Sequence, residues 1–282
     1  MKAQAKNSVI AGKYRLLGEL GSGAMGSVWR AEHLTLRSHV AIKLIHLELV
    51  ATPDVVPRFL REAQAAALLR SPHVVQILDH GIDNGTPYIA MELLEGESLA
   101  ARLDRVGRLG VEETARIVLH LGRAIGRAHD AGIVHRDLKP DNIFLVKNDD
   151  EEIAKVLDFG IAKSTAVTLV VAPLTSTRNG AVMGTPHYMS PEQTEGTRDV
   201  DHRTDIWAMG VIAYECLVGA RPFDRGTLGG LLAAIRNDPL PVPSTVADVP
   251  AGFDRWFARA CARELEQRFA SAREASLEFR AS

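Results

Sequence analysis

Short runs of alternating or continuous apolar residues, separated by turn residues, fill the first third of the chain and predict strands. The first of these runs lie within residues 14–46, which glycines interrupt at positions 18, 21, 23 and 26. Two more flank Asp83-Asn84-Gly85, a strong signal for a β-hairpin turn. The expected strands are Tyr14–Leu20, Gly26–His33, Ser38–His46, Val74–His80 and Pro87–Leu93.

A helical period interrupts this pattern over Asp54–Leu69. The apolar residues expected near one face of that helix are Phe59, Ala63, Ala66 and Ala67. From Ser98 onward helices dominate, over about residues 98–106, 112–132, 201–219, 228–237, 252–263 and 271–281. A strand-rich lobe therefore meets a helix-rich lobe near Leu94-Glu95-Gly96, and a cleft between two such lobes is a common place for a ligand site.

Composition excludes several classes of partner. The chain has 282 residues, 46% of them hydrophobic, which allows one or two domains with a large core. Its net charge of -2 implies no strong attraction to nucleic acid or anionic membranes. The N-terminus lacks a signal-peptide pattern, and the longest apolar stretch, Trp207–Ala220, is shorter than the ~20 residues of a membrane span. We expect a cytoplasmic domain without membrane contact; an anchor beyond residue 282 stays open.

Residue types that often bind metals have simpler explanations here. Cys216 and Cys261 lie in apolar contexts without metal-ligand spacing, so we expect buried free thiols in a reducing compartment. None of the ten histidines forms an H-E-x-x-H pattern, so a zinc site is not expected. The acidic run 149–152, between strand-like segments Ile143–Val146 and Ala154–Leu157, reads as a solvated hairpin tip rather than a metal site.

The candidate chemistry is concentrated in two segments. His135-Arg136-Asp137-Leu138-Lys139-Pro140-Asp141-Asn142 is followed, sixteen positions after Asn142, by Asp158-Phe159-Gly160. A carboxylate at Asp137 can orient a hydroxyl and accept its proton, while Lys139 can neutralise charge on a transferring group. Asn142 and Asp158 offer oxygen ligands to a hard cation such as Mg²⁺. His135 is expected to be a packed, hydrogen-bonded histidine rather than a general base.

Two features of the strand-rich lobe could serve a phosphate ligand. Glycines at 21, 23 and 26 let the backbone fold over phosphates, although a flexible hairpin turn has the same pattern. A dinucleotide-binding motif would need a helix next, whereas Ser27–Glu32 looks like a strand. Lys43, on an apolar strand, is costly to bury unless it is paired. Glu62 is the best-placed partner and Glu48 a weaker one; the alternative is a lysine that points to solvent.

These pieces together resemble the catalytic domain of eukaryotic-type serine/threonine protein kinases, over about residues 14–280. The order G-x-G-x-x-G-x-V, V-A-I-K, H-R-D-L-x-x-x-N and D-F-G is the signature set of that family. The resemblance implies an α+β fold of two lobes: a small antiparallel N-lobe with one main helix over 14–94, and a larger helical C-lobe over 95–280. It also implies ATP and Mg²⁺ as cofactors, with Mn²⁺ as an option, and proteins with serine or threonine acceptors as substrates.

The resemblance assigns roles residue by residue. The glycine-rich stretch would cover the phosphates, Val28 and Ala41 would enclose adenine, and Met91 would be the gatekeeper before a hinge. The implied ATP-binding residues are Leu20, Gly21, Ser22, Gly23, Ala24, Met25, Gly26, Val28, Ala41, Lys43, Met91, Glu92 and Leu94. The implied catalytic residues are Asp137, Lys139, Lys43, Glu62 and Thr185, with Asn142 and Asp158 as metal ligands.

Residues after the catalytic segment indicate substrate class and architecture. Lys139 and the segment Gly184–Glu192 are typical of serine/threonine rather than tyrosine kinases. The run 190–193, Ser-Pro-Glu-Gln, is similar to bacterial members of the family and has serine where A-P-E has alanine. By the same resemblance, Glu192 would pair with Arg268, and Asp205 would hold the backbone of the catalytic loop.

Regulation is suggested by Arg136, a basic residue directly before Asp137 that could bind a phosphorylated loop. Thr177 is the expected main autophosphorylation site, with Thr175 or Ser176 secondary, through a transient dimer. The run Thr168–Leu174 is apolar, and we expect either that it docks in the unphosphorylated state or that its apolar residues are incidental.

Two other functions fit parts of the sequence. A pseudokinase would bind nucleotide and act as a scaffold, but the candidate catalytic and metal residues are all present. A small-molecule phosphotransferase could have a similar kinase-like lobe. The segment Gly184–Glu192 argues against this function, because it is expected to shape a peptide-binding surface.

Overall fold

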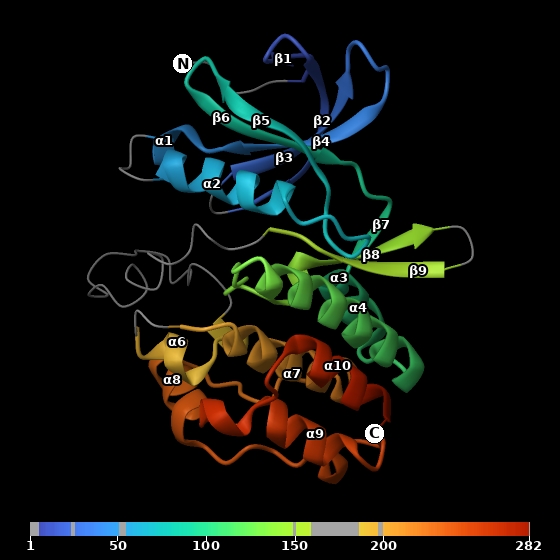
Figure 1. Ribbon diagram of the computed structural model, residues 1–282, viewed down its shortest axis with the longest axis vertical. Helices are drawn as coiled ribbons and strands as arrows, with labels where there is room; N and C mark the ends of the chain where they lie inside the picture. The colour runs from blue at the N-terminus through green and yellow to red at the C-terminus, as the bar shows by residue number, and fades with distance from the viewer. Residues whose placement is uncertain are drawn as a thin grey trace. The chain divides into compact units, whose positions relative to one another are not determined.

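The computed structural model in Figure 1 describes residues 6–23, 26–50, 55–148, 151–158, 186–196 and 200–281. The chain divides into two compact units. The first unit comprises Met1–Arg70 and Val75–Glu95, and the second comprises Ser71–Val74 and Gly96–Ser282. The short stretch Ser71–Val74 thus belongs to the second unit, although it lies within residues 14–94, the expected bounds of the N-lobe.

The first unit is a six-stranded sheet in which every pair of neighbours is antiparallel, in the order β1-β2-β3-β4-β6-β5. Its strands are β1 (Val9–Ile10), β2 (Tyr14–Ser22), β3 (Gly26–His33), β4 (His39–Ile45), β5 (Ile77–Asp83) and β6 (Thr86–Glu92). Its helices are α1 (Leu47–Val50) and α2 (Val55–Ala67). The pattern had not predicted β1, which pairs with β2 and extends the sheet to before Tyr14.

The two faces of this sheet bury different sets of side chains. One face carries a core cluster of Ile10, Tyr14, Leu16, Ala31, Val40, Ile42, Leu44, Tyr88 and Ala90. On the other face, Ile45 and Ile89 pack against Phe59 and Ala63 of α2, which lies along the sheet in Figure 1. Ala66 is also buried, but Ala67 is exposed, so its expected place near that face is wrong. Ala67 is the last residue of α2 and lies about 100° around the helix from Ala66.

The β5–β6 turn follows the sequence signal. Asn84 and Gly85 have φ of 47° and 80°, the two positive values that a two-residue type I′ hairpin needs. The strand before it begins at Ile77 rather than Val74. Val74 instead forms a parallel bridge with Val156 in the second unit, which removes it from the first sheet.

The second unit is helical apart from a three-stranded sheet in the order β7-β8-β9. Its strands are β7 (Gly96–Ser98), β8 (Ile143–Asn148) and β9 (Glu151–Val156). Its α-helices are α3 (Leu99–Val106), α4 (Val111–Asp130), α6 (Pro191–Thr194), α7 (Arg203–Val218), α8 (Leu228–Asn237), α9 (Phe253–Ala260) and α10 (Ala272–Ala281). Short 3₁₀ turns are η1 (Pro140–Asn142), η3 (Pro186–Tyr188), η4 (Pro243–Thr245) and η5 (Leu265–Gln267). The three-residue strand β7 was too short to predict.

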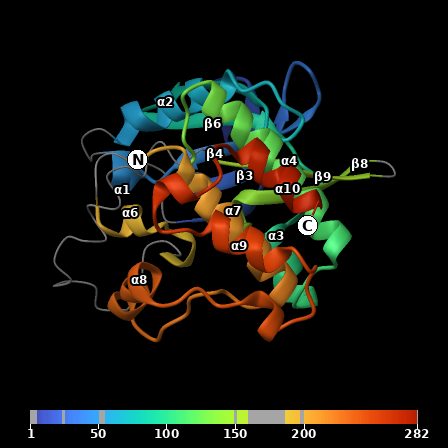
Figure 2. The same cartoon turned by 60° about the horizontal axis from the view of Figure 1, so that its bottom comes forward.

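Helix α7 is the central helix of this unit and packs against α4, α9 and α10, as Figure 2 shows. It is buried on nearly all sides. A Cβ at Gly210 would lie 2.6 Å from the Cys261 sulfur, so glycine permits this close helix approach. Cys216 and Cys261 are both buried free thiols, as predicted, and burial raises the pKa of each thiol. Across the described residues, no helix combines the length and apolarity needed to cross a membrane.

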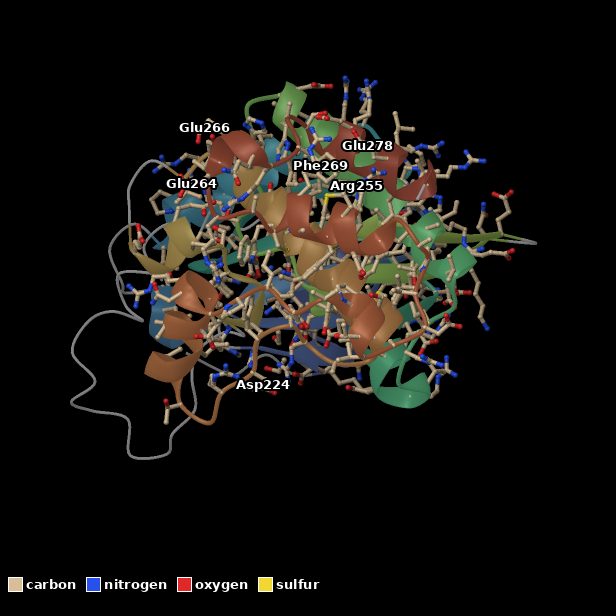
Figure 3. The ribbon with its side chains drawn as sticks, turned by 90° about the horizontal axis from the view of Figure 1, so that it is seen from below. Asp224, Arg255, Glu264, Glu266, Phe269 and Glu278 are labelled. Atoms are coloured by element: carbon tan, nitrogen blue, oxygen red, sulfur yellow. The ribbon has the colours of Figure 1, made fainter. Side chains whose placement is uncertain are left out.

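Charged side chains tie the outer elements of the second unit together. Figure 3 labels Phe269 and Glu278 at one end, where the Arg259 guanidinium lies 4.2 Å from the Phe269 ring centre and 2.8 Å from Glu278 Oε1. Elsewhere Arg102 binds Glu97 and Glu152, with 2.6 Å between the paired atoms in each case. The acidic run had predicted that Glu152 is solvated at a hairpin tip. Glu152 instead forms an ion pair with Arg102 within the fold.

Candidate active site

The segment His135–Asn142 is anchored by a buried carboxylate. Asp205, in the first turn of α7, is 1% exposed and accepts hydrogen bonds from the backbone N–H groups of His135 and Arg136, both at 2.8 Å. His129 of α4 lies 2.8 Å from the same carboxylate through its Nε2. The predicted hold of Asp205 on this loop is confirmed.

His135 is fully buried and both of its ring nitrogens are engaged. Its Nδ1 lies 3.3 Å from the Asp137 amide nitrogen, and its Nε2 lies 3.0 Å from the carbonyl oxygen of Leu157. Because the amide can only donate, Nδ1 accepts and Nε2 carries the proton that binds Leu157. His135 is therefore the packed, hydrogen-bonded residue that was predicted, and it links the loop to the end of β9.

Asn142 and Asp137 are joined side chain to side chain. The Asn142 amide nitrogen donates to the carbonyl oxygen of Asp137 at 2.8 Å and to its carboxylate at 3.0 Å. Both amide hydrogens are thus used on Asp137, which directs the other end of the amide, Oδ1, away from that residue. Lys139 Nζ lies 4.0 Å from the Asp137 carboxylate. One loop therefore presents a carboxylate, an ammonium and an oriented amide oxygen.

Asp158 lies two residues after the end of β9, and the residue before it is bonded to the same loop. The amide of Leu157 donates to the carbonyl oxygen of Asn142 at 2.8 Å, while its own carbonyl binds His135. Asp158 has a φ of 36° and Arg136 a φ of 62°, both unusual for residues with a side chain. Strained backbone at two residues of one candidate site is typical of sites whose geometry is fixed by their surroundings.

Two histidines that the sequence had not singled out hold the free edge of β9. The Ala154 amide donates to His120 Nδ1 at 3.1 Å, and the Ala154 carbonyl lies 3.3 Å from His73 Nδ1. The two rings stack with centres 4.2 Å apart. Burial lowers the pKa of His73, and it lowers the pKa of His120 to about 4, so both are neutral at pH 7. Together they supply the donor and acceptor that a neighbouring strand would offer to Ala154.

In the first unit, strand register places the expected nucleotide-binding residues on one sheet face. Val28 is opposite Lys43, and Ala41 is opposite Met91, so these four share the face on which α2 packs. Ala41 is buried, and the side chains of Val28, Lys43 and Met91 are partly buried. Glu62 is on α2, but its side chain lies outside the described residues, so its pairing with Lys43 stays a prediction.

The glycine-rich stretch is a β-hairpin, with Gly21 opposite Val28 and Ser22 opposite Ser27. A strand follows it, which excludes the dinucleotide-binding motif. A Cβ at Gly26 would lie 1.9 Å from the Leu44 carbonyl oxygen, so Gly26 is required by the sheet itself. A Cβ at Gly21 or Gly23 meets no described atom within 4 Å. Ala24 and Met25 lie outside the described residues, and Leu20 beside the hairpin is 55% exposed.

The expected hinge begins with a closed loop of hydrogen bonds. The Gln76 amide donates to the Glu92 carboxylate at 2.8 Å, and the Glu92 amide donates to the Gln76 carbonyl at 3.0 Å. The backbone amide of Glu92 is thus used within the fold. Leu94 lies two residues further on and is partly buried.

The expected brace of the helical unit is present. Arg268 donates to both oxygens of Glu192 at 2.8 Å, and its guanidinium lies 5.2 Å from the Trp207 ring centre. Arg136, which is expected to bind a phosphorylated loop, donates to the Val200 carbonyl at 3.3 Å. Its buried Nε has no hydrogen-bond partner among the described residues. The other expected regulatory and catalytic residues lie outside the described residues: Thr175, Ser176, Thr177, Thr185 and the run Thr168–Leu174.

The donor set fits a nucleotide-bound Mg²⁺ ion. Mg²⁺ in phosphoryl-transfer sites takes one or two protein oxygen ligands, and phosphates and waters complete its octahedron. Asn142 Oδ1 and the Asp158 carboxylate offer two oxygens of this kind, and the Asn142 carbonyl accepts from the amide of Leu157, the residue before Asp158. In the described part of the chain, no three His, Cys, Asp or Glu side chains converge to hold a metal by themselves.

Known proteins with similar sequences and structures carry kinase names. The chain is 42% identical to serine/threonine-protein kinase Pkn1 of Myxococcus xanthus over 265 residues, which cover 93% of this chain and 37% of Pkn1. It is 37% identical to PknH of Mycobacterium tuberculosis over 267 residues, 94% of this chain and 41% of PknH. The chain spans half or less of the length of these curated relatives and of pkn3 of Myxococcus xanthus.

Solved structures agree with this likeness. The crystal structure of the Mycobacterium tuberculosis PknI kinase domain is 30% identical, covers 99% of both chains and gives a TM-score of 0.73. A double mutant of the same domain gives 0.78 at 28% identity, again over 99% of both chains. The model of the protein kinase domain family matches residues 14–241 of this chain. With most of its length matched by that model, the chain belongs to the protein kinase family.

Proposed function

We propose that this domain is a non-specific serine/threonine protein kinase, which transfers the γ-phosphate of ATP to serine and threonine hydroxyls of proteins. The observation that carries the proposal is the set of hydrogen bonds that join Asp137, Asn142 and the residue before Asp158. Asn142 binds Asp137 through its amide and binds Leu157, the neighbour of Asp158, through its carbonyl. In this proposal, the network would hold a general base and two cation ligands near one another.

ATP with Mg²⁺, or Mn²⁺ in its place, would supply an activated phosphoryl group and neutralise its charge when bound. Asn142 and Asp158 would hold the cation. Asp137 would orient the acceptor hydroxyl and take its proton, and Lys139 would offset charge on the transferred group. The phosphoryl group would pass directly to the acceptor hydroxyl, without a covalent enzyme intermediate. Positioning and electrostatics would therefore supply the rate enhancement.

The first unit would bind the nucleotide. Val28 and Ala41, on the sheet face shared with Lys43, would enclose adenine together with Leu20. Met91 would act as gatekeeper, and Glu92 to Leu94 as the hinge. No described atom lies within 4 Å of a Cβ built at Gly21 or Gly23. This supports an approach of phosphates to the hairpin Gly21–Gly26, which includes Ser22, Ala24 and Met25. Lys43 would contact phosphates and pair with Glu62.

Serine/threonine specificity rests on Lys139 and on the names of the relatives, which are serine/threonine-protein kinases. Thr185 would bond Asp137 and Lys139. Arg136, with its unpartnered buried Nε among the described residues, would bind a phosphate on the segment that contains Thr177. Thr175 and Ser176 are the secondary acceptors in this proposal, and a transient dimer would allow phosphorylation between two copies.

The proposal is tested by incubating the protein with γ-labelled ATP and MgCl₂ alongside a generic protein substrate, small alcohols and aminoglycosides. We expect label on serine and threonine of the protein substrate, and none without MgCl₂ or MnCl₂. Label transferred only to small molecules would favour a small-molecule phosphotransferase. Nucleotide binding without any transfer would favour a pseudokinase.

A further inference from the structure

Arg136 is the strained residue of the catalytic loop and lies directly before the candidate base. Its φ of 62° is a left-handed conformation that costs free energy for a residue with a side chain. Asp205 fixes the two peptide groups before it, through the amides of His135 and Arg136. In the next peptide group, which joins Arg136 to Asp137, the amide donates to His135 Nδ1 at 3.3 Å, and the carbonyl is held by a different residue.

That residue is Gln193 on α6, which is 7% exposed. Its Nε2 donates to the Arg136 carbonyl oxygen at 2.8 Å. Its Oε1 accepts from the Ser190 amide at 3.1 Å, as one half of a capping box at the start of α6. Because its two ends have different partners, the amide of Gln193 cannot rotate without losing both hydrogen bonds.

Ser190 connects this arrangement to α7. The serine is fully buried, and its hydroxyl lies 2.7 Å from the hydroxyl of Thr204, which is 1% exposed. Thr204 is the residue before Asp205. Ser190 therefore ties the start of α6, which carries Gln193, to the first turn of α7.

We propose that Gln193 is a positioning residue for Asp137: it clamps the peptide between Arg136 and Asp137, while Asp205 clamps the two before it. The inference rests on the proposed kinase function, in which Asp137 is the base. It also gives the run Ser190-Pro191-Glu192-Gln193 a physical meaning. Ser190 caps α6 and binds α7, Glu192 pairs with Arg268, and Gln193 reaches the catalytic loop.

The chain offers a one-atom test with a matched control. Gln193→Glu keeps an oxygen acceptor for the Ser190 amide, because glutamate also completes a capping box, but removes the donor to the Arg136 carbonyl. Ser190→Ala does the reverse: it weakens the cap and removes the bond to Thr204, while it keeps the Gln193 donor. Both variants and wild type are compared by melting temperature, by kcat and KM for ATP and a peptide, and by hydrogen–deuterium exchange of residues 133–142.

We expect Gln193→Glu to lower kcat about tenfold or more, since small displacements of a catalytic group are costly, with KM for ATP within about twofold. Exchange over residues 133–142 should rise, whereas Ser190→Ala should lower the melting temperature and leave kcat and this exchange near wild type. Equal kcat and equal exchange in Gln193→Glu and wild type would overturn the inference. So would equal losses in both variants, which would make Gln193 only a helix cap. If the wild-type protein transferred no phosphate, the proposed function would be wrong. Hydrogen–deuterium exchange over residues 133–142 would still test whether Gln193 holds the loop.

Discussion

Lys43 and Asp137 are positioned by different physical means. Lys43 lies on a seven-residue strand, and its placement follows from sheet register: Val28 and Ile89 are its partners on the two neighbouring strands. Asp137 lies on a loop, and its placement depends on side chains that are far away in the sequence. Asp205 and Gln193 hold the loop backbone, and Asn142 holds the carboxylate.

The difference shows which changes each unit should tolerate. In a sheet, many backbone hydrogen bonds together fix the position of each residue. Substitution of a single exposed side chain should therefore leave Lys43 in place. The catalytic loop depends on a few buried polar contacts, and loss of one partner leaves another buried group unsatisfied. We therefore expect the second unit to respond more strongly to single substitutions of polar residues.

The largest effect is expected at the candidate base. Asp137→Asn removes the proton acceptor but keeps the size of the side chain, so phosphorylation of protein substrates should fall by about 10³-fold or more. ATP binding, measured by calorimetry, should stay within about threefold of wild type. Turnover that matches wild type would contradict the assignment of Asp137.

The next largest effect is on the free energy of unfolding, which should depend more on a buried ion pair than on an exposed one. Arg268→Met removes the buried guanidinium that binds both oxygens of Glu192, whose side chain is 14% exposed, and should cost about 3–5 kcal/mol of unfolding free energy. The matched change in the first unit is Lys13→Met, which breaks a more exposed pair with Asp79 and should have a small effect. Denaturant unfolding of both variants measures the contrast, and equal losses would refute it.

Within the first unit, two glycines of one hairpin should behave differently. Gly26→Ala places a Cβ against the Leu44 carbonyl and should destabilise the protein by about 3 kcal/mol. Gly21→Ala meets no described atom and should leave the melting temperature within about 2 °C, while raising KM for ATP several-fold. If Gly21→Ala changed neither KM nor stability, the phosphate role of the hairpin would lose its support.

The smallest expected effect concerns pH. Because the pKa of His120 falls from 6.5 to about 4 on folding, the unfolded state binds more protons between these values. Stability is therefore fully present above pH 6.5 and declines as pH falls toward 4. His120→Asn keeps an acceptor near the position of Nδ1 but does not titrate, so its melting temperature should fall less steeply over this range. An unchanged slope would show that His120 does not contribute to it.

The sequence predicted most elements because their patterns are local. The strands around Lys43, the Asn84-Gly85 turn and the buried helix with Trp207 all follow from periodicity, turn chemistry or apolar length. It missed β1 and β7, which have two and three residues and carry no pattern of their own. It also extended a strand to Val74, because alternation cannot show that Val74 pairs with Val156 instead.

Residues of the candidate site that belong to a family motif could be predicted from the sequence. Residues that only position another residue could not. Asp205 and the Glu192–Arg268 pair lie as the resemblance implied, and His135 is packed and hydrogen-bonded as predicted from the sequence. The contacts of Gln193 with the loop and of His73 and His120 with β9 join segments 34 to 81 positions apart. No spacing rule covers such pairs, since only the folded backbone brings an amide or a ring nitrogen within reach of a carbonyl oxygen.

The central claim is that this domain phosphorylates serine and threonine by means of Asp137. It is tested most directly by mass spectrometry of the protein after incubation with ATP and MgCl₂, with Asp137→Asn treated in parallel. We predict phosphate on serine and threonine of the wild-type protein, including Thr177, and none on the variant. Wild-type protein that stays unmodified and also leaves an added protein substrate unmodified would contradict the account, as would equal phosphorylation of the variant.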